Sequence, residues 1–273
     1  MEGRGGAGRW GVPPGVDPTL PQHHLDLKPG DVGNTVLLPG DPKRTDFIAS
    51  FFDDAERIAD KREYVTWTGT YRGVRISTTS TGIGCPSAAI AVEELANVGA
   101  RTVIRVGTCG TFQEEIEQGT LIVATGAVRG EGTTTEYIPV EYPAVADLDA
   151  AWTLRRIARE RDLPHVVGGV RSHDAFYIES PWAHGDYRGR IDPWVRAGVL
   201  AVENETAAVF VVGALRGLRS ASLLVGAGSL LGEPGEPPDP ERLGEGLRRA
   251  IEVACEAAVA LDELDGAAGA PTT

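Results

Sequence analysis

Apolar residues recur along this chain in two spacings, and each spacing predicts a different element. Short runs of adjacent apolar residues predict buried strands, and apolar residues repeated every three or four positions predict helices. The pattern places strands at 35–38, 64–71, 74–79, 102–106, 120–128, 166–172, 199–202 and 220–225, and helices at 43–52, 86–98, 148–161, 206–215 and 243–264.

This alternation of strands and helices predicts an α/β fold. Helices that connect successive strands cover both faces of a mostly parallel sheet. We therefore expect a single-domain three-layer α/β/α architecture with a central mixed, largely parallel twisted sheet. Ligands in such folds bind outside the carboxyl ends of the strands, so the residues that follow each strand are the first candidates for a site.

The helix at 86–98 has the strongest pattern. Ile90, Val92, Leu95 and Val98 approximate one apolar face, and Ser87 is expected to cap the first turn. The ends of the chain lack such periodicity. We expect a disordered N-terminal extension at 1–20, which is rich in Gly, Pro and Arg, a domain at 21–265 and a flexible tail at 266–273.

Charge and composition narrow the classes of function. The net charge of -13 argues against nonspecific binding of nucleic acid, although a small anion can still bind in a local positive pocket. The apolar runs are too short for a membrane span, and no signal peptide opens the chain. The cysteines, Cys85, Cys109 and Cys255, have no metal-binding spacing, so we expect a reduced, cytoplasmic protein.

Three glycine-rich segments, at 37–44, 81–87 and 105–110, follow apolar runs and have arginines close by. Glycine lets backbone N–H groups approach an anion, and a guanidinium matches an oxyanion. Gly40, Arg44, Arg105 and Thr108 are therefore candidates for a phosphate site. The alternative is that the Gly40 segment is a plain turn with solvated arginines. Arg105 stands inside an apolar run, however, and must find an anion.

Three other segments carry candidate polar chemistry. Glu203 and Glu205 flank Asn204 where a strand gives way to a helix, and they suit either the diol of a ribose or the positive end of the helix. His173, beside Asp174, is more typical of a loop than of an acid–base pair. Phe176 can stack on a base or pack in the core. Cys109 has no evident activating base and is not expected to be a nucleophile.

Taken together, these segments resemble the nucleoside phosphorylase-I family, and the uridine phosphorylase branch most closely. The resemblance spans about 24–264 and rests on eight motifs. They are Gly-Asp-Pro-x-Arg at 40–44, Arg-Glu-Tyr-x-x-Trp at 62–67, Ser-Thr-Gly-Ile-Gly-x-Pro-Ser at 80–87, Ala-Val-Glu-Glu-Leu at 91–95, Arg-Val-Gly-Thr-Cys-Gly at 105–110, Glu-Tyr-Pro-Ala-Val-Ala-Asp at 141–147, Asp-x-Phe-Tyr at 174–177 and Glu-x-Glu-Thr-Ala at 203–207.

The resemblance implies phosphorolysis of a nucleoside to free base and ribose-1-phosphate, with inorganic phosphate as co-substrate and no required cofactor. It also implies a homo-oligomer, a hexamer built as a trimer of dimers. The implied contacts are Gly40, Arg44, Arg62, Arg105 and Thr108 for phosphate, His24, Glu203, Asn204 and Glu205 for ribose, Cys109, Gly110, Phe176, Ser180 and Trp182 for the base, and Glu63, Ile83 and Ser87 for an optional potassium ion. Arg62 and His24 would act across a subunit interface.

The base-binding half departs from the family pattern. Ser180 and Trp182 stand where uridine phosphorylases carry a Gln and an Arg that read uracil, and Asn204 replaces a Met. The segment 225–228 lacks the acid that purine-specific members use. We expect a rewritten base pocket, with Glu179 or His173 as a substitute acid. The competing functions are a purine or other nucleoside phosphorylase, a nucleosidase that uses water, and a non-catalytic nucleoside-binding protein.

Overall fold

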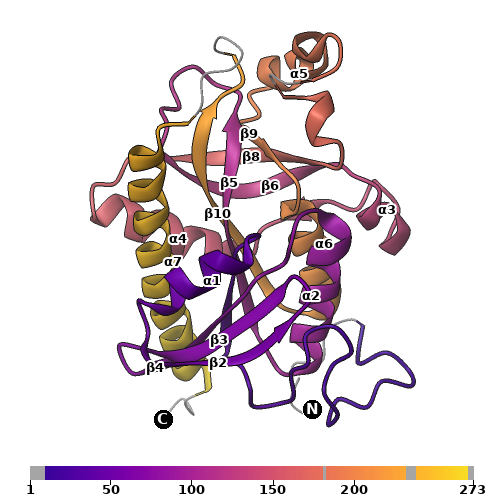
Figure 1. Cartoon of the computed structure of the whole chain (residues 1–273), viewed down its shortest axis with the longest axis vertical. Coiled ribbons are helices and arrows are strands. Elements are labelled where there is room, and N and C mark those ends of the chain that lie inside the picture. The colour runs from indigo at the N-terminus through magenta and orange to yellow at the C-terminus, as the bar shows by residue number, and fades with distance from the viewer. Residues whose placement is uncertain (1–9, 181–182, 232–237, 270–273) are drawn as a thin grey trace.

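The computed structural model describes residues 10–180, 183–231 and 238–269, and its centre is one mixed sheet of ten strands (Figure 1). The strands follow the order β10-β6-β8-β9-β5-β1-β4-β3-β2, with β7 paired to β6. Their bounds are β1 Thr35–Leu38, β2 Asp53–Lys61, β3 Tyr64–Tyr71, β4 Val74–Thr79, β5 Thr102–Thr111, β6 Leu121–Gly130, β7 Ala144–Val145, β8 His165–His173, β9 Ala201–Glu203 and β10 Arg219–Ser229.

Part of this sheet closes on itself. Strand β5 pairs in parallel with β10, β10 pairs antiparallel with β6, β6 and β8 are parallel, β8 and β9 are parallel, and β9 returns antiparallel to β5. Strand β1 joins this ring to the antiparallel meander β4-β3-β2. The mixed sheet expected from the sequence is therefore confirmed, while its closure into a ring is an additional feature.

Helices cover both faces of the sheet and complete the predicted three layers. On one face, α2 (Cys85–Asn97) and α6 (Thr206–Arg216) bury their apolar sides in one core cluster. On the other, α1 (Pro42–Ala49), α4 (Leu148–Glu160) and α7 (Pro240–Gly269) share a second cluster. The remaining helices are α3 (Thr133–Tyr137), α5 (Tyr187–Arg196) and the 3-10 turn η1 (Phe176–Ile178).

Five elements were absent from the sequence prediction: β2, α3, β7, η1 and α5. Strand β2 carries charges along most of its length, and as an edge strand paired only with β3 it needs no alternating apolar face. Helix α5 contains Gly189 and Pro193, which weaken its helical propensity. Asp186 caps it, and Tyr187 and Ile191 bury themselves in a small third core, so tertiary packing stabilises it.

Two local predictions were wrong. Ser87 does not cap α2, because its hydroxyl donates to the carbonyls of Ile83 and Gly84 and the N-cap position is Gly84 itself. The segment 105–110 is not a loop after a strand, since β5 continues to Thr111. Pairing with β10 on one side and β9 on the other holds these glycine-rich residues extended.

The ends of the described chain pack on the domain. The Trp10 N–H donates to the Leu215 carbonyl at 3.0 Å, and its ring stacks on Tyr137. Residues 1–9 of the predicted extension lie outside the described residues, and α7 extends past residue 266 to Gly269. In the described ranges, no helix combines the length and apolar character needed to cross a bilayer.

Candidate active site

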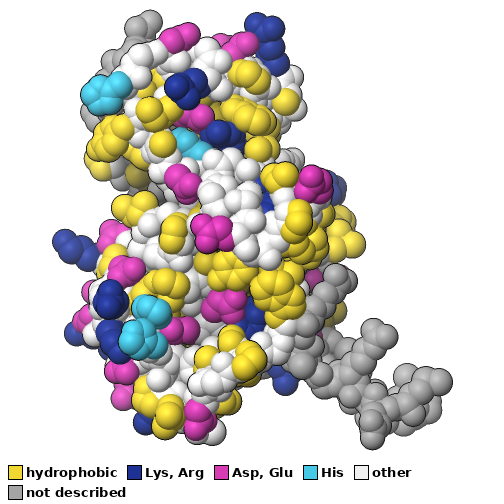
Figure 2. All heavy atoms as spheres, turned by 90° about the vertical axis from the view of Figure 1, so that its right-hand side faces the viewer, with side chains coloured by type: hydrophobic (Ala, Val, Ile, Leu, Met, Phe, Trp, Pro, Cys, Tyr) yellow, Lys and Arg dark blue, Asp and Glu magenta, His cyan; other side chains and the backbone are white. Residues whose placement is uncertain are grey.

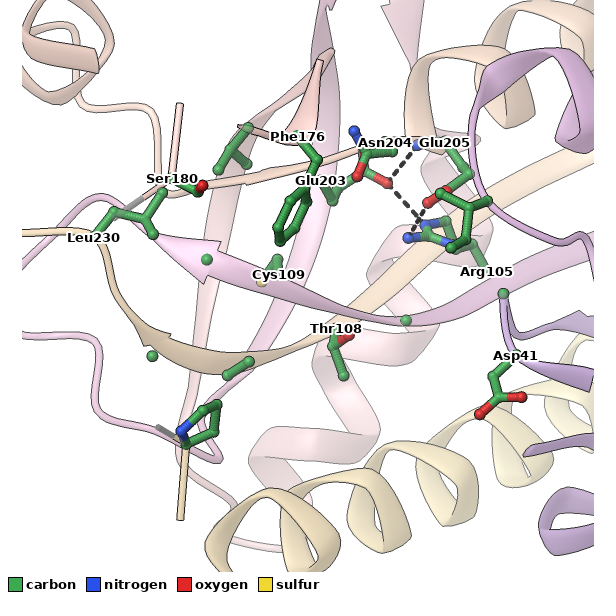
Figure 3. A pocket seen from close by; sticks show the side chains of 18 of the residues that line it. Asp41, Arg105, Thr108, Cys109, Phe176, Ser180, Glu203, Asn204, Glu205 and Leu230 are labelled. Carbon is green, nitrogen blue, oxygen red and sulfur yellow. Dashed lines mark hydrogen bonds and ion pairs between the residues drawn. The ribbon is translucent and has the colours of Figure 1, made fainter. Parts of the chain in front are cut away.

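A cavity of about 1320 Å³ opens beside the C-terminal half of β5, and all three glycine-rich segments line it (Figure 3). Gly40 follows β1, Gly82 and Ile83 precede α2, and residues Arg105 to Gly110 form its floor along β5. The parallel pairing of β1 with β4 and β5 brings these chain segments together. Segments distant in sequence thus meet at one place, as expected for the carboxyl ends of neighbouring strands.

One end of the cavity carries an arginine without a protein partner. Arg44, in the first turns of α1, lines the cavity, and its guanidinium makes no hydrogen bond or ion pair with any described residue. Burial lowers its pKa, Asp41 opposes this shift, and the charge of Arg105 adds to the lowering. A partly buried guanidinium beside a second one attracts an anion to this end.

Arg105 has found the anions that its buried position requires. Its Nε donates to Glu203 Oε2 at 2.8 Å, and its Nη2 pairs with Glu205 Oε2 (Figure 3). Only 4% of Arg105 is exposed. Desolvation lowers the pKa of this guanidinium, but the carboxylates of Glu205 and Glu203 outweigh that effect and raise it. Arg105 is therefore a fixed cation with a defined orientation.

Glu203 combines the two roles between which the sequence left a choice. Its carboxylate binds Arg105, and it also accepts hydrogen bonds from the N–H groups of Glu205 and Thr206 at the start of α6. The Ser172 hydroxyl donates to its other oxygen at 2.5 Å. These contacts occupy the carboxylate on every side, so Glu203 orients Arg105 and the N-terminus of α6.

Glu205 reaches further into the cavity. Gly84 donates its N–H to Glu205 Oε1 at 2.6 Å, and Arg105 holds the other oxygen. Burial raises the pKa of this carboxyl, and Arg105 opposes the shift. Asn204, which also lines the cavity, donates from Nδ2 to the His173 carbonyl. The two side chains give the middle of the cavity fixed hydrogen-bonding groups.

The opposite end of the cavity is apolar on two sides. In Figure 3, Phe176, Ser180 and Leu230 lie together at one side of the cavity, and Asp41 lies at the other. Phe176 is 48% exposed, and its ring meets that of Tyr177 edge to face. Leu230 packs over Gly110, where an added Cβ would lie 3.0 Å from its side chain.

Polar groups complete that apolar end. Glu179, His173 and Ser180 are buried and line the cavity. Arg171, on β8, pairs with Glu179 Oε2, and His173 Nδ1 lies 3.6 Å from the same oxygen. Burial lowers the pKa of His173 to about 4, with the Arg171 charge as the second cause, so its imidazole is neutral at pH 7. Burial raises the pKa of Glu179, and Arg171 opposes this. Of the two acids considered from sequence, Glu179 fits better.

Cys109 carries no nucleophilic chemistry. Its side chain is buried in β5, and desolvation, followed by the charge of Glu203, raises the pKa of the thiol far above its usual range. The thiolate is therefore not populated at neutral pH. A reaction in this cavity must bring its own nucleophile.

Several predicted residues lie elsewhere. Arg62, exposed in the turn between β2 and β3, and His24 do not line this chain's cavity. His24 is held by Glu94, which accepts its backbone N–H and lies 2.7 Å from its Nδ1. Trp182 falls outside the described residues. Glu63, Ile83 and Ser87 line the rim of the cavity.

Sequence reasoning missed residues that line the cavity or hold a candidate site residue in place, among them Leu230, Arg171 and Glu94. Arg171 stands in a strand run, and the signal was the same as for Arg105, a charge among apolar residues that needs an anion. Leu230 is distant from every motif, and only the packing of β10 against β5 brings it to Gly110. Glu94 lies within the 91–95 motif, but its hydrogen bonds to residues 24 and 25 join segments far apart in sequence.

Comparison with known proteins places this geometry in context. Residues 34–261 match the model of the phosphorylase superfamily. A guanosine phosphorylase of Halorubrum lacusprofundi is 43% identical over 245 residues, covering 88% of this chain and 99% of that protein. A uridine phosphorylase of Thermococcus kodakarensis is 47% identical over 205 residues, covering 73% of this chain and 74% of that protein.

A solved structure agrees with the sequence comparisons. The crystal structure of uridine phosphorylase from Vibrio fischeri superimposes with a TM-score of 0.80 at 35% identity. The match covers 89% of this chain and 99% of that one. The fold is therefore shared over nearly the whole domain, whereas the names of the relatives include both a purine and a pyrimidine nucleoside.

Proposed function

The chain belongs to the phosphorylase superfamily, as a nucleoside phosphorylase, and we propose that its cavity joins phosphate to the ribose of a nucleoside and releases the free base. The observation that carries this proposal is Arg44, whose guanidinium has no hydrogen-bond or ion-pair partner in the described part of the chain and lies close to the anchored Arg105. A hydrolase that uses water as its nucleophile has no need of such a pair.

Phosphate binds at the arginine end of the cavity. The guanidinium of Arg44 and the remaining donors of Arg105 hold its oxygens, and the N–H of Gly40 and the hydroxyl of Thr108 complete the cradle. Because Glu203 and Glu205 fix the orientation of Arg105, this cation is positioned before the ligand arrives. Preorganised charge of this kind costs little reorganisation during the reaction.

The ribose lies in the middle of the cavity, over Glu205 and Asn204. Each oxygen of Glu205 keeps a lone pair beyond its contact with Gly84 or Arg105, and these can accept hydrogen bonds from the 2'- and 3'-hydroxyls. Glu203 acts as a positioning residue behind them. The base then extends toward Phe176, Cys109, Gly110 and Ser180, and toward the neighbourhood of Trp182.

The reaction follows from this order of subsites. Breaking the glycosidic bond builds positive charge on the ribose, and a phosphate dianion held beneath C1' stabilises that charge and then bonds to C1'. The leaving base takes the bonding electrons and must receive hydrogen bonds or a proton. No protein nucleophile and no cofactor takes part in this scheme.

We also propose that the active form is a homo-oligomer, with the hexamer of the resembling family as its expected state. Arg62 and His24 would then complete a neighbouring subunit's phosphate and ribose subsites. On the face that Figure 2 shows, groups of apolar side chains alternate with charged and polar ones. Exposed apolar residues of the described chain include Ile83 and, on α4 at another part of the surface, Leu148 and Trp152. Exposed apolar residues of this kind are expected where subunits meet.

A potassium ion is compatible with the rim of the cavity. The Glu63 carboxylate, the Ile83 carbonyl and the Ser87 hydroxyl are oxygen donors, and the last two lie 3.2 Å apart. Oxygen donors suit hard cations. Within the described residues, no three His, Cys, Asp or Glu side chains gather as a site for a metal ion. Such an ion would be structural, and a higher melting temperature in potassium than in sodium chloride would reveal it.

The testing experiment is a panel assay of the purified full chain. Uridine, thymidine, inosine, guanosine and adenosine are supplied with and without phosphate, and released base and ribose-1-phosphate are measured. We expect release from at least one nucleoside only when phosphate is present. Release without phosphate would indicate a nucleosidase, and binding without turnover would indicate a non-catalytic nucleoside-binding protein. Either result contradicts the proposed function.

A reducing, cytoplasmic setting agrees with the three unpaired, buried cysteines.

A further inference from the structure

The buried carboxylate of Glu179, at the base end of the cavity, uses only one of its two oxygens in contacts with the described protein. Glu179 is 7% exposed and lines the cavity. Its Oε2 binds Arg171 and faces His173, whereas its Oε1 accepts no hydrogen bond from any described residue. The scheme for phosphate and ribose does not use this group. Oε1 is not one of the described side-chain atoms that are both buried and without a partner, so it is open to the solvent of the cavity and can accept hydrogen bonds from a ligand.

The cation behind Glu179 is itself immobilised. The Arg171 guanidinium stacks on the Trp194 ring of α5, with Cζ 4.9 Å from the ring centroid. Its other side lies against Gly130, where an added Cβ would come within 3.1 Å of Nη2. Arg171 therefore holds one carboxylate oxygen in place, and Glu179 presents the other in a defined direction.

A second unmatched group stands next to it. Ser180 is 4% exposed and lines the same cavity, and among the described residues its Oγ has no hydrogen-bond partner. A hydroxyl donates one hydrogen bond and accepts others. The cavity thus offers one carboxylate acceptor beside one adaptable donor at Glu179 and Ser180.

We propose that Glu179 determines base specificity and selects 2-amino-6-oxopurine nucleosides, the guanosine class. This inference rests on the proposed function. The guanine edge presents N1–H and the 2-amino group side by side. The two lone pairs of Glu179 Oε1 can accept one hydrogen bond from each of these donors, and the guanine O6 accepts from the Ser180 hydroxyl. The cavity of about 1320 Å³ has room for a purine.

Other common bases fit this pair less well. Uracil has a single N–H between two carbonyl oxygens, and at least one of those oxygens would face the carboxylate. Hypoxanthine keeps N1–H and O6 but lacks the 2-amino donor. Adenine places an acceptor at N1 where the carboxylate requires a donor. Each mismatch leaves a buried polar group unpaired, which discriminates more strongly than a lost apolar contact.

The test compares kcat/KM for guanosine, inosine, 1-methylguanosine and uridine with saturating phosphate. We expect guanosine to exceed inosine and 1-methylguanosine by about 10-fold or more, the loss typical of one hydrogen bond to a charged group. These substrate edits need no mutation and so do not depend on a variant that folds. A preference for uridine, or equal rates with guanosine and inosine, would overturn the proposal.

Variants locate the effect. In Glu179→Gln the amide offers one acceptor and one donor, so the guanosine-to-inosine ratio should fall about 10-fold. Ser180→Ala should lower kcat/KM for guanosine and for inosine by the same factor, because both bases carry O6. The guanosine-to-inosine ratio should therefore stay unchanged. Glu136→Gln makes the same substitution at an exposed residue of α3 that lies away from the cavity lining, and it is the matched control. If Glu179 had only a structural role, Glu179→Gln would lower kcat/KM for all substrates by the same factor. This result would contradict the proposal.

Binding of free bases separates this inference from the proposed function. Calorimetry with guanine and hypoxanthine needs neither phosphate nor turnover. Tighter binding of guanine that depends on Glu179, without any phosphorolysis, would support the specificity and refute the reaction. Phosphorolysis with a base preference indifferent to Glu179 would support the reaction and refute the specificity.

Discussion

The Arg105 guanidinium folds back over Gly107, two residues along the same strand. A Cβ added at residue 107 would lie 2.8 Å from Arg105 Nη2 and 2.9 Å from its Cζ. The absence of a side chain at Gly107 therefore allows Arg105 to reach Glu203 and Glu205 inside the sheet.

Gly107→Ala should therefore displace the guanidinium and weaken the phosphate subsite. Since the neighbouring Arg105 side chain has to shift, we expect the KM for phosphate to rise about 10-fold, in the range of one charge-assisted hydrogen bond. Steady-state kinetics with phosphate varied at saturating nucleoside measures this. Gly228→Ala, at a cavity-lining glycine with nothing within 4 Å of the added Cβ, is the control and should have little effect.

Arg44→Ala should impair catalysis without destabilising the protein. Arg44 has no ion pair or hydrogen bond to lose among the described residues, so its free energy of unfolding should change by less than about 0.5 kcal/mol. Loss of a guanidinium from phosphate should raise the KM for phosphate about 10- to 100-fold. Lys43→Ala removes the exposed neighbouring charge as a control. Equal effects of the two substitutions would show that only general electrostatics is involved.

Arg105→Met, unlike Arg44→Ala, should strongly destabilise the folded protein. Removing one partner of a buried ion pair leaves its carboxylates uncompensated, which costs about 3–5 kcal/mol. Glu203 and Glu205 are both buried, so a loss in this range is expected in urea-induced unfolding. Arg44→Met serves as the comparison, with the same substitution at a guanidinium that has no protein partner. A stable Arg105→Met protein would show that the glutamates are neutral without Arg105.

His173 should make the protein sensitive to mild acid. In the folded chain the pKa of His173 is about 4, below its ordinary value of 6.5, because burial disfavours the charged imidazole. Between these values the unfolded state binds more protons than the folded state, so stability is complete above pH 6.5 and declines toward pH 4.

His173→Gln should flatten this decline. The raised pKa values of Glu179 and Glu205 act in the opposite sense, so the difference between the variant and the unmodified protein isolates the histidine. Urea-induced unfolding at a series of pH values from 4 to 7 measures it. Parallel pH dependences in both proteins would show that the imidazole is not buried in its neutral form.

The amino-acid sequence by itself determined the kinds of elements and the phosphate chemistry. Strong apolar periodicity located α2, α4 and α6 to within a few residues, because burial of an apolar face dominates the stability of such helices. It also required an anion for Arg105, since a charge inside an apolar strand cannot remain unpaired. The sequence pattern did not predict strand β2 and helix α5, because their local propensity is weak and tertiary contacts stabilise them.

Only the tertiary structure decided which role each candidate residue has in the site. Sequence left Glu203 between sugar binding and helix capping, and its contacts with Arg105, Ser172 and the first N–H groups of α6 decide for positioning. The sequence likewise left His173 and Glu179 as equal candidates for the acid that acts on the nucleobase. Burial beside Arg171 makes the imidazole neutral and leaves Glu179 with a free oxygen, because pKa and hydrogen-bonding capacity depend on neighbours that are remote in the chain.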